Sequence, residues 1–283
     1  MYRIKTFFLM ALLTIVFILL GGAIAGEQGL IMAFVIALVL NFIGYWKSDT
    51  IAIKMTRSRP LSENEAPELY AMVRKLTQGA SMPMPKLYLT PSSQPNAFAT
   101  GRSPKHAAVA VTAGIMKMLD RHELEGVIAH ELAHIRNYDT LISTFATVLA
   151  GALAFIARMG QFRMLFGGMR GNRNNGAALA LQLVAIILAP IAAMLVRMAI
   201  SRSREYLADA TGARIAGTPD GLASALTKMS RAAERNPMRI NEAASHMFIV
   251  NPIAGQRFAS LFSTHPPLEQ RVARLRRIED KRA

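Results

Sequence analysis

Three residues on one predicted helix have the types and spacing of a hydrolytic metal site. The helix is predicted over Asp120–Asn137, and it contains His130, Glu131 and His134 in the order His-Glu-Leu-Ala-His. Residues four apart lie on one face of an α-helix, so both imidazoles can reach one metal ion at about 2.0–2.1 Å, the distance that zinc prefers. Glu131 would then lie beside the zinc and take a proton from zinc-bound water.

The third ligand of such a site has to come from elsewhere in the chain. Glu205 and Asp209 lie one helical turn apart in a second predicted helix, in the order Glu-Tyr-Leu-Ala-Asp. Glu205 would complete a His₂Glu set and leave the fourth zinc position open to water and substrate. Asp209 would accept a hydrogen bond from the free ring nitrogen of a zinc histidine and fix its tautomer. The sequence therefore predicts a Zn²⁺ ion held by His130, His134 and Glu205.

The predicted zinc helix also has the signals of a stable helix. Asp120 is a candidate N-cap with Glu123 three residues later, which is the capping-box pattern. One apolar stripe would pack into the core, formed by Leu124, Val127, Ile128, Leu132 and Ile135.

A small β-sheet is predicted before the zinc helix. A helix is expected from Ser62 to about Gln78, followed by short strands at 86–90, 96–100 and 107–112. In zinc proteases an edge strand can hold the substrate as an added strand. The order along the chain makes Asn96, Ala97 and Phe98 the candidate substrate-binding residues, although Asn96 and Gly101 can equally serve the turns of a hairpin.

Composition places this site on a membrane protein. The 283 residues are 52% hydrophobic, carry a formal charge of +15 and include no cysteine. This combination favours basic faces next to an anionic bilayer. No nucleic-acid motif is present, so nucleic acid is not an expected partner. The absence of cysteine excludes disulfides and a cysteine-based zinc site.

Two uncharged apolar runs at the N-terminus predict a transmembrane hairpin. They extend from Thr6 to Gly26 and from Gln28 to Trp46. A cleaved signal peptide is the alternative reading of the first run. Basic residues flank both ends of the pair: Arg3 and Lys5 before it, and Lys47, Lys54, Arg57 and Arg59 after it. Such residues favour the cytoplasmic side, so both ends and the catalytic part are predicted to face the cytoplasm.

A second pair of apolar runs, 140–157 and 174–196, lies between the two groups of zinc ligands. The Arg-rich loop between these runs conflicts with the positive-inside rule if both runs cross the bilayer, so their topology stays open. The expected organisation is residues 1–48 as the hairpin, 49–139 and 200–283 as two parts of the catalytic domain, and 140–199 as the second pair. The expected fold class is an α+β membrane protein with transmembrane helices and a mainly helical, zincin-like catalytic domain with a small sheet.

The C-terminal part contributes two further predicted helices. One begins at Thr218-Pro219-Asp220 and extends to about Glu234, and the last begins at Pro267 or Leu268. Residues 236–264 are expected to be irregular. His265, followed by two prolines, could donate a hydrogen bond to a developing oxyanion, although its spacing favours a role in capping the loop.

Taken together, the motifs resemble those of the HtpX group of bacterial membrane zinc proteases. The matching segments are His130–His134, Glu205–Asp209 and Ser263–Arg271, and the resemblance extends over essentially the whole chain. It implies zinc on His130, His134 and Glu205, with Glu131 as the catalytic base. It also implies an inner-membrane endopeptidase with a cytoplasmic active site, acting in stress-linked quality control of membrane proteins.

The resemblance further implies substrate contacts from Asn96 and its strand and an active-site role for His265. The expected partners are polypeptide substrates and the lipid bilayer. Two alternatives compete with this interpretation: a processing peptidase like the CAAX prenyl proteases, for whose large intramembrane chamber this chain is short, and a non-catalytic zinc-binding membrane scaffold. Glu131 argues against the scaffold, because a structural zinc site needs no adjacent base.

Overall fold

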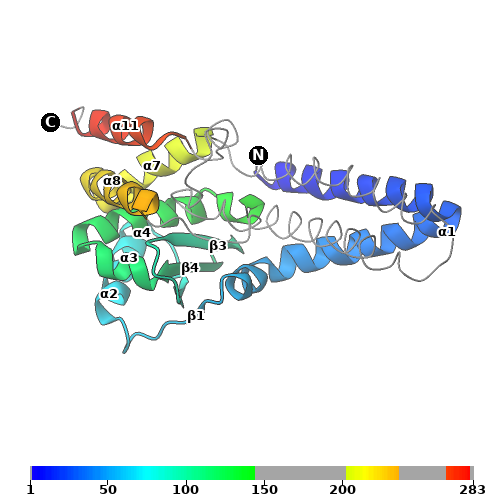
Figure 1. Cartoon of the computed structure of the whole chain (residues 1–283), viewed down its shortest axis with the longest axis horizontal. Coiled ribbons are helices and arrows are strands. Elements are labelled where there is room, and N and C mark those ends of the chain that lie inside the picture. Colours follow the sequence, from blue (N-terminus) through cyan, green and yellow to red (C-terminus); the bar gives the residue numbers. More distant parts are fainter. Residues whose placement is uncertain (1, 144–201, 236–265, 281–283) are drawn as a thin grey trace. The chain divides into compact units, whose positions relative to one another are not determined.

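The structure, a computed structural model, describes residues 2–143, 202–235 and 266–280. This part of the chain is mainly helical, with one four-stranded sheet (Figure 1). The chain divides into two compact units, Met1–Ser48 with Phe145–Ala199, and Asp49–Thr144 with Ile200–Ala283. The described part of the second unit contains the sheet and all the predicted zinc ligands.

Helix α1 (Tyr2–Met55) folds back on itself at Gly26, within the first unit (Figure 1). Gly26 has a φ of +60°, which glycine adopts without the steric cost of a Cβ. Across this turn, Nδ2 of Asn41 donates to Oγ1 of Thr14 at 2.9 Å and to the backbone oxygen of Met10 at 3.3 Å. The chain therefore reverses where the sequence predicts a turn. Gly26–Lys47 is the one segment in the described ranges that is long and apolar enough to cross a bilayer.

The sheet has the order β1-β2-β4-β3, so β3 lies at an edge. Its strands are β1 (Arg59–Pro60), β2 (Lys86–Thr90), β3 (Ala97–Ser103) and β4 (His106–Thr112). Strands β2 and β4 are parallel, whereas β1–β2 and β3–β4 are antiparallel. The three predicted strands are confirmed, and the two-residue β1 was not predicted.

Alternate residues of the strands pack into two separate clusters, because successive side chains point to opposite faces of a sheet. Ala97, Val109 and Val111 belong to the main hydrophobic core. Phe98 and Ala110 face the other way and form a small cluster with Ile53 from the last turns of α1.

The main core joins the sheet to helices α2 (Pro67–Gly79), α3 (Ala113–Met118), α4 (Arg121–Arg136), α7 (Arg202–Ala216), α8 (Asp220–Arg235) and α11 (Leu268–Asp280). Helix α4 packs against β3, α7 and α8, which places the predicted zinc helix at the centre of the second unit (Figure 1). The predicted capping box is confirmed: Oδ1 of Asp120 accepts from the Glu123 N–H at 2.9 Å, and Oε2 of Glu123 accepts from the Asp120 N–H at 3.1 Å.

The predicted start of α2 at Ser62 is wrong, since the helix begins five residues later, at Pro67. Oε2 of Glu65 instead accepts hydrogen bonds from the N–H and Oγ of Ser62, at 3.0 and 2.8 Å. The Ser-x-x-Glu pattern therefore closes a turn before the helix, and proline at the first position begins the helix itself.

Candidate active site

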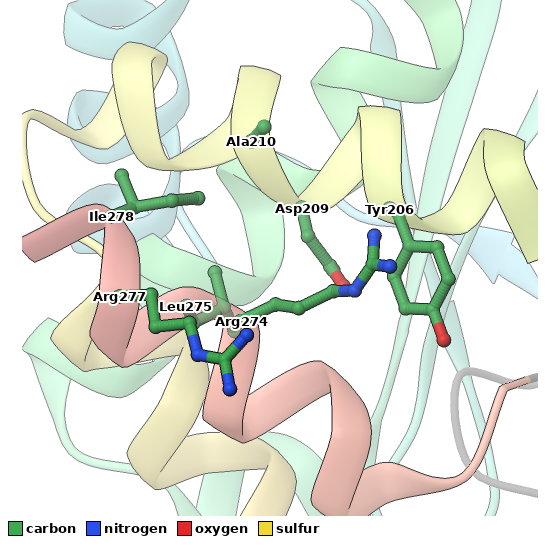
Figure 2. A pocket seen from close by; sticks show the side chains of 7 residues that line it. All are labelled: Tyr206, Asp209, Ala210, Arg274, Leu275, Arg277 and Ile278. Atoms are coloured by element: carbon green, nitrogen blue, oxygen red, sulfur yellow. The ribbon is translucent and has the colours of Figure 1, made fainter.

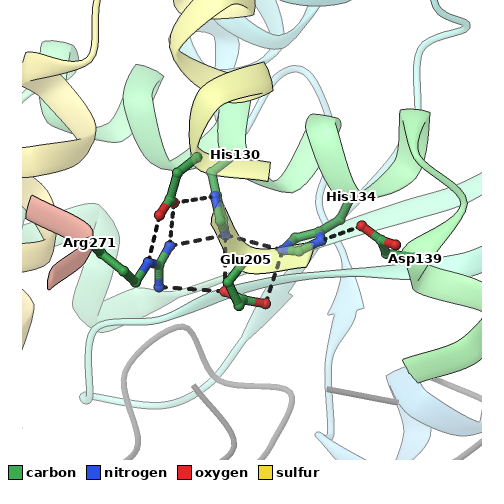
Figure 3. Close-up of polar contacts among 6 residues, drawn as sticks. His130, His134, Asp139, Glu205 and Arg271 are labelled. Atoms are coloured by element: carbon green, nitrogen blue, oxygen red, sulfur yellow. Dashed lines mark hydrogen bonds and ion pairs between the residues drawn. The ribbon is translucent and has the colours of Figure 1, made fainter. Parts of the chain in front are cut away.

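The three predicted metal ligands meet in one buried group (Figure 3). Nε2 of His130 and Nε2 of His134, on successive turns of α4, are 3.1 Å apart. Glu205, on the neighbouring helix α7, places Oε1 at 3.6 Å from Nε2 of His134 and Oε2 at 3.8 Å from Nε2 of His130. All three side chains are largely shielded from solvent.

This geometry fits a tetrahedral zinc ion. Ligand atoms about 2.0–2.1 Å from one tetrahedral ion lie about 3.3–3.4 Å from one another. The observed distances of 3.1, 3.6 and 3.8 Å lie on both sides of that value. Two imidazoles and one carboxylate are also the donor set of catalytic zinc sites that keep a fourth position open. The residues present therefore fit zinc in both distance and chemistry.

A carboxylate lies next to the other ring nitrogen of each histidine. Nδ1 of His130 lies 3.1 Å from Oδ1 of Asp209, and Nδ1 of His134 lies 3.2 Å from Oδ2 of Asp139. When Nδ1 carries the proton and faces a carboxylate, the lone pair of Nε2 is left for the metal. The position of Asp209 agrees with the sequence prediction, whereas Asp139 was missed. Asp139 lies three residues after Arg136, the last residue of α4, so the helical spacing that indicated the other residues does not reach it.

Arg271 of α11 is a second residue that the sequence analysis assigned no role. Its side chain is 1% exposed, and it donates to both carboxylate oxygens of Asp209, from Nε at 2.9 Å and from Nη2 at 2.6 Å (Figure 3). Nη1 lies 3.6 Å from Oε2 of Glu205. Burial lowers the pKa of this guanidinium, but the charges of Asp209 and Glu205 outweigh burial and raise it, so Arg271 stays charged. The available signal was its position three residues after Leu268 and four before Leu275, on the inward face of α11.

Glu131 is buried, with 4% of its surface exposed. Burial raises its pKa to about 7, and the nearby charge of Glu205 acts in the same direction. The positive charges of His134 and Arg271 and a hydrogen bond from the backbone N–H of Ala99 lower the pKa and limit the rise. A carboxyl group with a pKa near neutrality can both accept and release a proton at physiological pH.

In the metal-free site, the pKa values of the two histidines are shifted in opposite directions. Burial lowers the pKa of His130. Burial also lowers the pKa of His134, but the hydrogen bond to Asp139 and the charges of Glu205 and Glu131 outweigh it and raise that pKa to about 9. His134 must therefore lose a proton when it binds a metal at neutral pH.

A close approach of two helix backbones sets the distance between the ligands on α4 and the ligand on α7. A Cβ built on Gly212 of α7 would lie 2.9 Å from Cα and 3.0 Å from N of His130. Real Cβ atoms essentially never come within 3.0 Å of another heavy atom, so only glycine fits here.

The predicted substrate residues lie in and next to the edge strand. Asn96 immediately precedes β3 and is 1% exposed, and its backbone N–H donates to Oγ1 of Thr112 at 2.9 Å. The side chains of Ala97 and Phe98 are buried in the two clusters on either face of the sheet. Contact with a substrate through these two residues is thus restricted to their backbone, and Ala99 is the β3 residue that reaches Glu131.

Several predicted features lie outside the described residues. These are His265, the irregular segment 236–264, the run 174–196 and all but the first residues of the run 140–157. The start of α11 at Leu268 agrees with the prediction.

A cavity of about 470 Å³ is lined by residues of α7 and α11 (Figure 2). It is lined by Tyr206, Asp209, Ala210, Arg274, Leu275, Arg277 and Ile278. The guanidinium of Arg274 stacks over the ring of Tyr206, 3.8 Å from its centroid.

Comparison with known proteins identifies the family. Residues 63–279 match the model described as peptidase family M48. The chain belongs to peptidase family M48. A relative named Protease HtpX homolog from Pelotomaculum thermopropionicum is 54% identical over 276 residues, which cover 97% of this chain and 98% of the relative. A protein of the same name from Pyrococcus furiosus is 52% identical over 276 residues, which cover 97% of this chain and 95% of that protein.

A solved structure shares the fold of this chain. The crystal structure of S. mikatae Ste24p matches with a TM-score of 0.50 at 18% identity, over 87% of this chain and 57% of the Ste24p chain. At that identity the likeness concerns the fold alone. The resemblance to the HtpX group is confirmed, and membership of M48 with HtpX-named relatives along the whole chain supports a membrane zinc endopeptidase.

Proposed function

We propose that this M48 peptidase is a zinc-dependent endopeptidase that cleaves misfolded or unassembled membrane proteins on the cytoplasmic side of a cell membrane. The observation that carries the proposal is the His130–His134–Glu205 group, whose distances suit one zinc ion, with Glu131 buried on the same helix. A structural zinc site would need neither this base nor an open fourth position.

The chain's own residues divide the chemistry of peptide hydrolysis between them. Zinc bound to this group would supply a Lewis acid that polarises the scissile carbonyl and makes water acidic enough to attack near neutral pH. Glu131 takes the proton of the attacking water and passes it to the leaving amine, and in the metal-free site burial raises its pKa to about 7, which makes it a stronger base than an exposed carboxylate. Asp209 and Asp139 hold the two imidazoles in the tautomer that presents Nε2, and Arg271 holds Asp209.

The edge strand β3 supports binding of an extended substrate. An edge strand presents backbone groups that a peptide can pair with as an additional strand. Because Ala99 of β3 donates to Glu131, a peptide beside β3 would run past the catalytic base. Such a site favours unfolded segments over folded domains. The proposed substrates are therefore polypeptides that have lost their folded structure. Asn96 and the backbone of Ala97 and Phe98 would contact the substrate. His265 would lie close to the reacting carbonyl.

The N-terminal segment supports location at a membrane. Gly26–Lys47 has a mean hydropathy of 2.1 and ends in Tyr45 and Trp46, whose rings pack edge to face at 5.6 Å. Tyrosine and tryptophan are enriched at the interface between bilayer and water, and basic residues lie mostly on the cytoplasmic side. We assign the chain to a bacterial inner membrane as a multi-pass protein, with the N-terminal hairpin spanning the bilayer and the second apolar pair as further candidate spans.

The test is cleavage of casein, an unfolded model substrate, by the full chain purified in detergent. The protein is assayed with zinc, after removal of metal by a chelator, and after zinc is restored. We expect cleavage to be lost with the chelator and regained with zinc. Cleavage that continues at full rate without metal would contradict the proposal, and folded, zinc-loaded protein that cleaves no unfolded polypeptide would favour the scaffold.

A further inference from the structure

A second cavity, of about 380 Å³, lies beside the end of the zinc helix, away from the metal ligands. It is lined by Arg136, Asn137, Leu207, Thr211 and Arg214. Three of these residues, Leu207, Thr211 and Arg214, belong to α7 and are spaced four and three positions apart. They therefore lie on one face of α7, which differs from the face that carries Glu205 and Asp209. Among the residues that the structure describes, the lining includes two arginines and no carboxylate.

Within the described residues, the cationic groups of this cavity have no ionic partner. Neither arginine forms an ion pair with a residue in the described ranges, and both side chains are exposed. Arg214 is held in place by its own helix, because its Nε donates to the Ala210 oxygen at 3.3 Å and its Nη2 to Oγ1 of Thr211 at 3.1 Å. Its remaining N–H groups are left for another acceptor.

Asn137, which also lines the cavity, carries a side-chain donor that is unpaired within the described residues. Its Nδ2 is shielded from solvent and makes no hydrogen bond with any residue that the structure describes. A buried donor without a partner is costly, and most buried polar groups in native proteins have one. The carbonyl end of α4 lies nearby and disfavours anions, but its partial charge of about half a unit is smaller than the two full charges of the arginines.

We propose that this cavity binds a phosphate group, with Arg136, Arg214 and Asn137 as hydrogen-bond donors. Guanidinium groups match the several acceptor oxygens of a phosphate, and the amide adds a neutral donor. Leu207, 42% exposed, supplies apolar surface at the same site. Asn137 also lies only three residues before the apolar run that begins at Thr140. The headgroup of an anionic phospholipid therefore suits the site, and free phosphate shares its chemistry.

The site would link the membrane to the catalytic centre. Arg136 and Asn137 follow the two histidine ligands on the zinc-helix side, and Arg214 lies on the helix that carries Glu205. A phosphate held by both sides joins the two helices whose spacing sets the metal geometry. The zinc ligands should therefore release metal more slowly when the cavity is filled.

The test measures the melting temperature of the full chain in detergent, with and without zinc, against short-chain phosphatidylglycerol, short-chain phosphatidylcholine and inorganic phosphate. We expect phosphatidylglycerol to raise Tm by about 3–6 °C at ten times its Kd. The variant R136Q/R214Q should need at least tenfold more phosphatidylglycerol for the same shift. The matched control R274Q/R277Q removes two arginines from the other cavity and should keep the wild-type response.

The remaining outcomes are decisive. A shift with inorganic phosphate that depends on Arg136 and Arg214 supports the phosphate site and makes free phosphate its source. The proposal is wrong if no phosphate compound shifts Tm, if R136Q/R214Q responds like the wild type, or if the control loses the response equally. If the double variant does not fold, the single variant R136Q replaces it, because the side chain of Arg136 is exposed. Because the shift is measured without zinc as well, failure here is separate from failure of the proposed peptidase.

Discussion

Replacing Gly212 with alanine tests whether the contact between α4 and α7 sets the zinc geometry. The new Cβ would lie 2.9 Å from Cα of His130, whereas carbon atoms in contact are about 3.5–4.0 Å apart. Helix α7 must therefore move away by about 0.5–1 Å. If it moves as a rigid body, the carboxylate oxygens of Glu205, now 3.6 and 3.8 Å from the histidine nitrogens, move well beyond the distances that one zinc ion can bridge.

The expected result for G212A is a loss of zinc affinity of about 10–100-fold in a protein that still folds. Overpacking costs about 1–3 kcal/mol, and alanine returns up to about 1 kcal/mol through its higher helix propensity. Affinity is measured by competition with a chromophoric zinc chelator, and folding by circular dichroism. The control is G79A at the end of α2, where a Cβ meets no atom within 4 Å. A folded G212A protein with wild-type zinc affinity would refute this reasoning.

Three further predictions follow from the polar contacts. D139N should weaken zinc binding about 10–100-fold, because a neutral amide holds the Nδ1 proton of His134 less strongly than a carboxylate does, and unchanged affinity would exclude this role. Metal-free protein should become less stable as the pH rises from 6.5 to 9, because the raised pKa of His134 stabilises the fold below its unfolded pKa and this contribution is lost as His134 deprotonates. Zinc affinity should rise over the same window, and a flat pH profile of both quantities would contradict the assignment. E123A should lower the free energy of unfolding by about 2–4 kcal/mol, because buried Glu123 caps α4 and accepts hydrogen bonds from Ser224 and Lys228. The control E125A breaks the surface ion pair with Lys75 and should lower it by less than about 1 kcal/mol, with both variants measured by urea denaturation.

Local sequence patterns were sufficient to predict the elements that carry the site. The period of the apolar residues located α4, and the four-residue spacing of His130 and His134 placed both ligands on one face of it. The same spacing in Glu205 and Asp209 predicted a candidate ligand and a carboxylate next to a histidine, and both side chains lie beside His130. These features depend on contacts within one helix turn, which the order of residues determines directly.

Features that depend on contacts between distant segments could not be predicted. No pattern within α11 assigns Arg271 a partner, and its burial follows from pairing with Asp209, 62 residues away. Phe98 was a candidate for substrate binding, but its face of the sheet is covered by Ile53 from α1. Alternation along a strand predicts two faces and does not say which segment covers each one.

The most direct test of the central claim compares metal content and turnover in two variants of the glutamates. For E131Q, the account predicts one zinc per chain by elemental analysis and casein cleavage reduced by about 10²–10⁴-fold, because the ligands remain and the base is lost. For E205Q, it predicts loss of bound zinc together with loss of cleavage. If E131Q cleaves at the wild-type rate, or if E205Q keeps both its zinc and its activity, the assigned roles are contradicted.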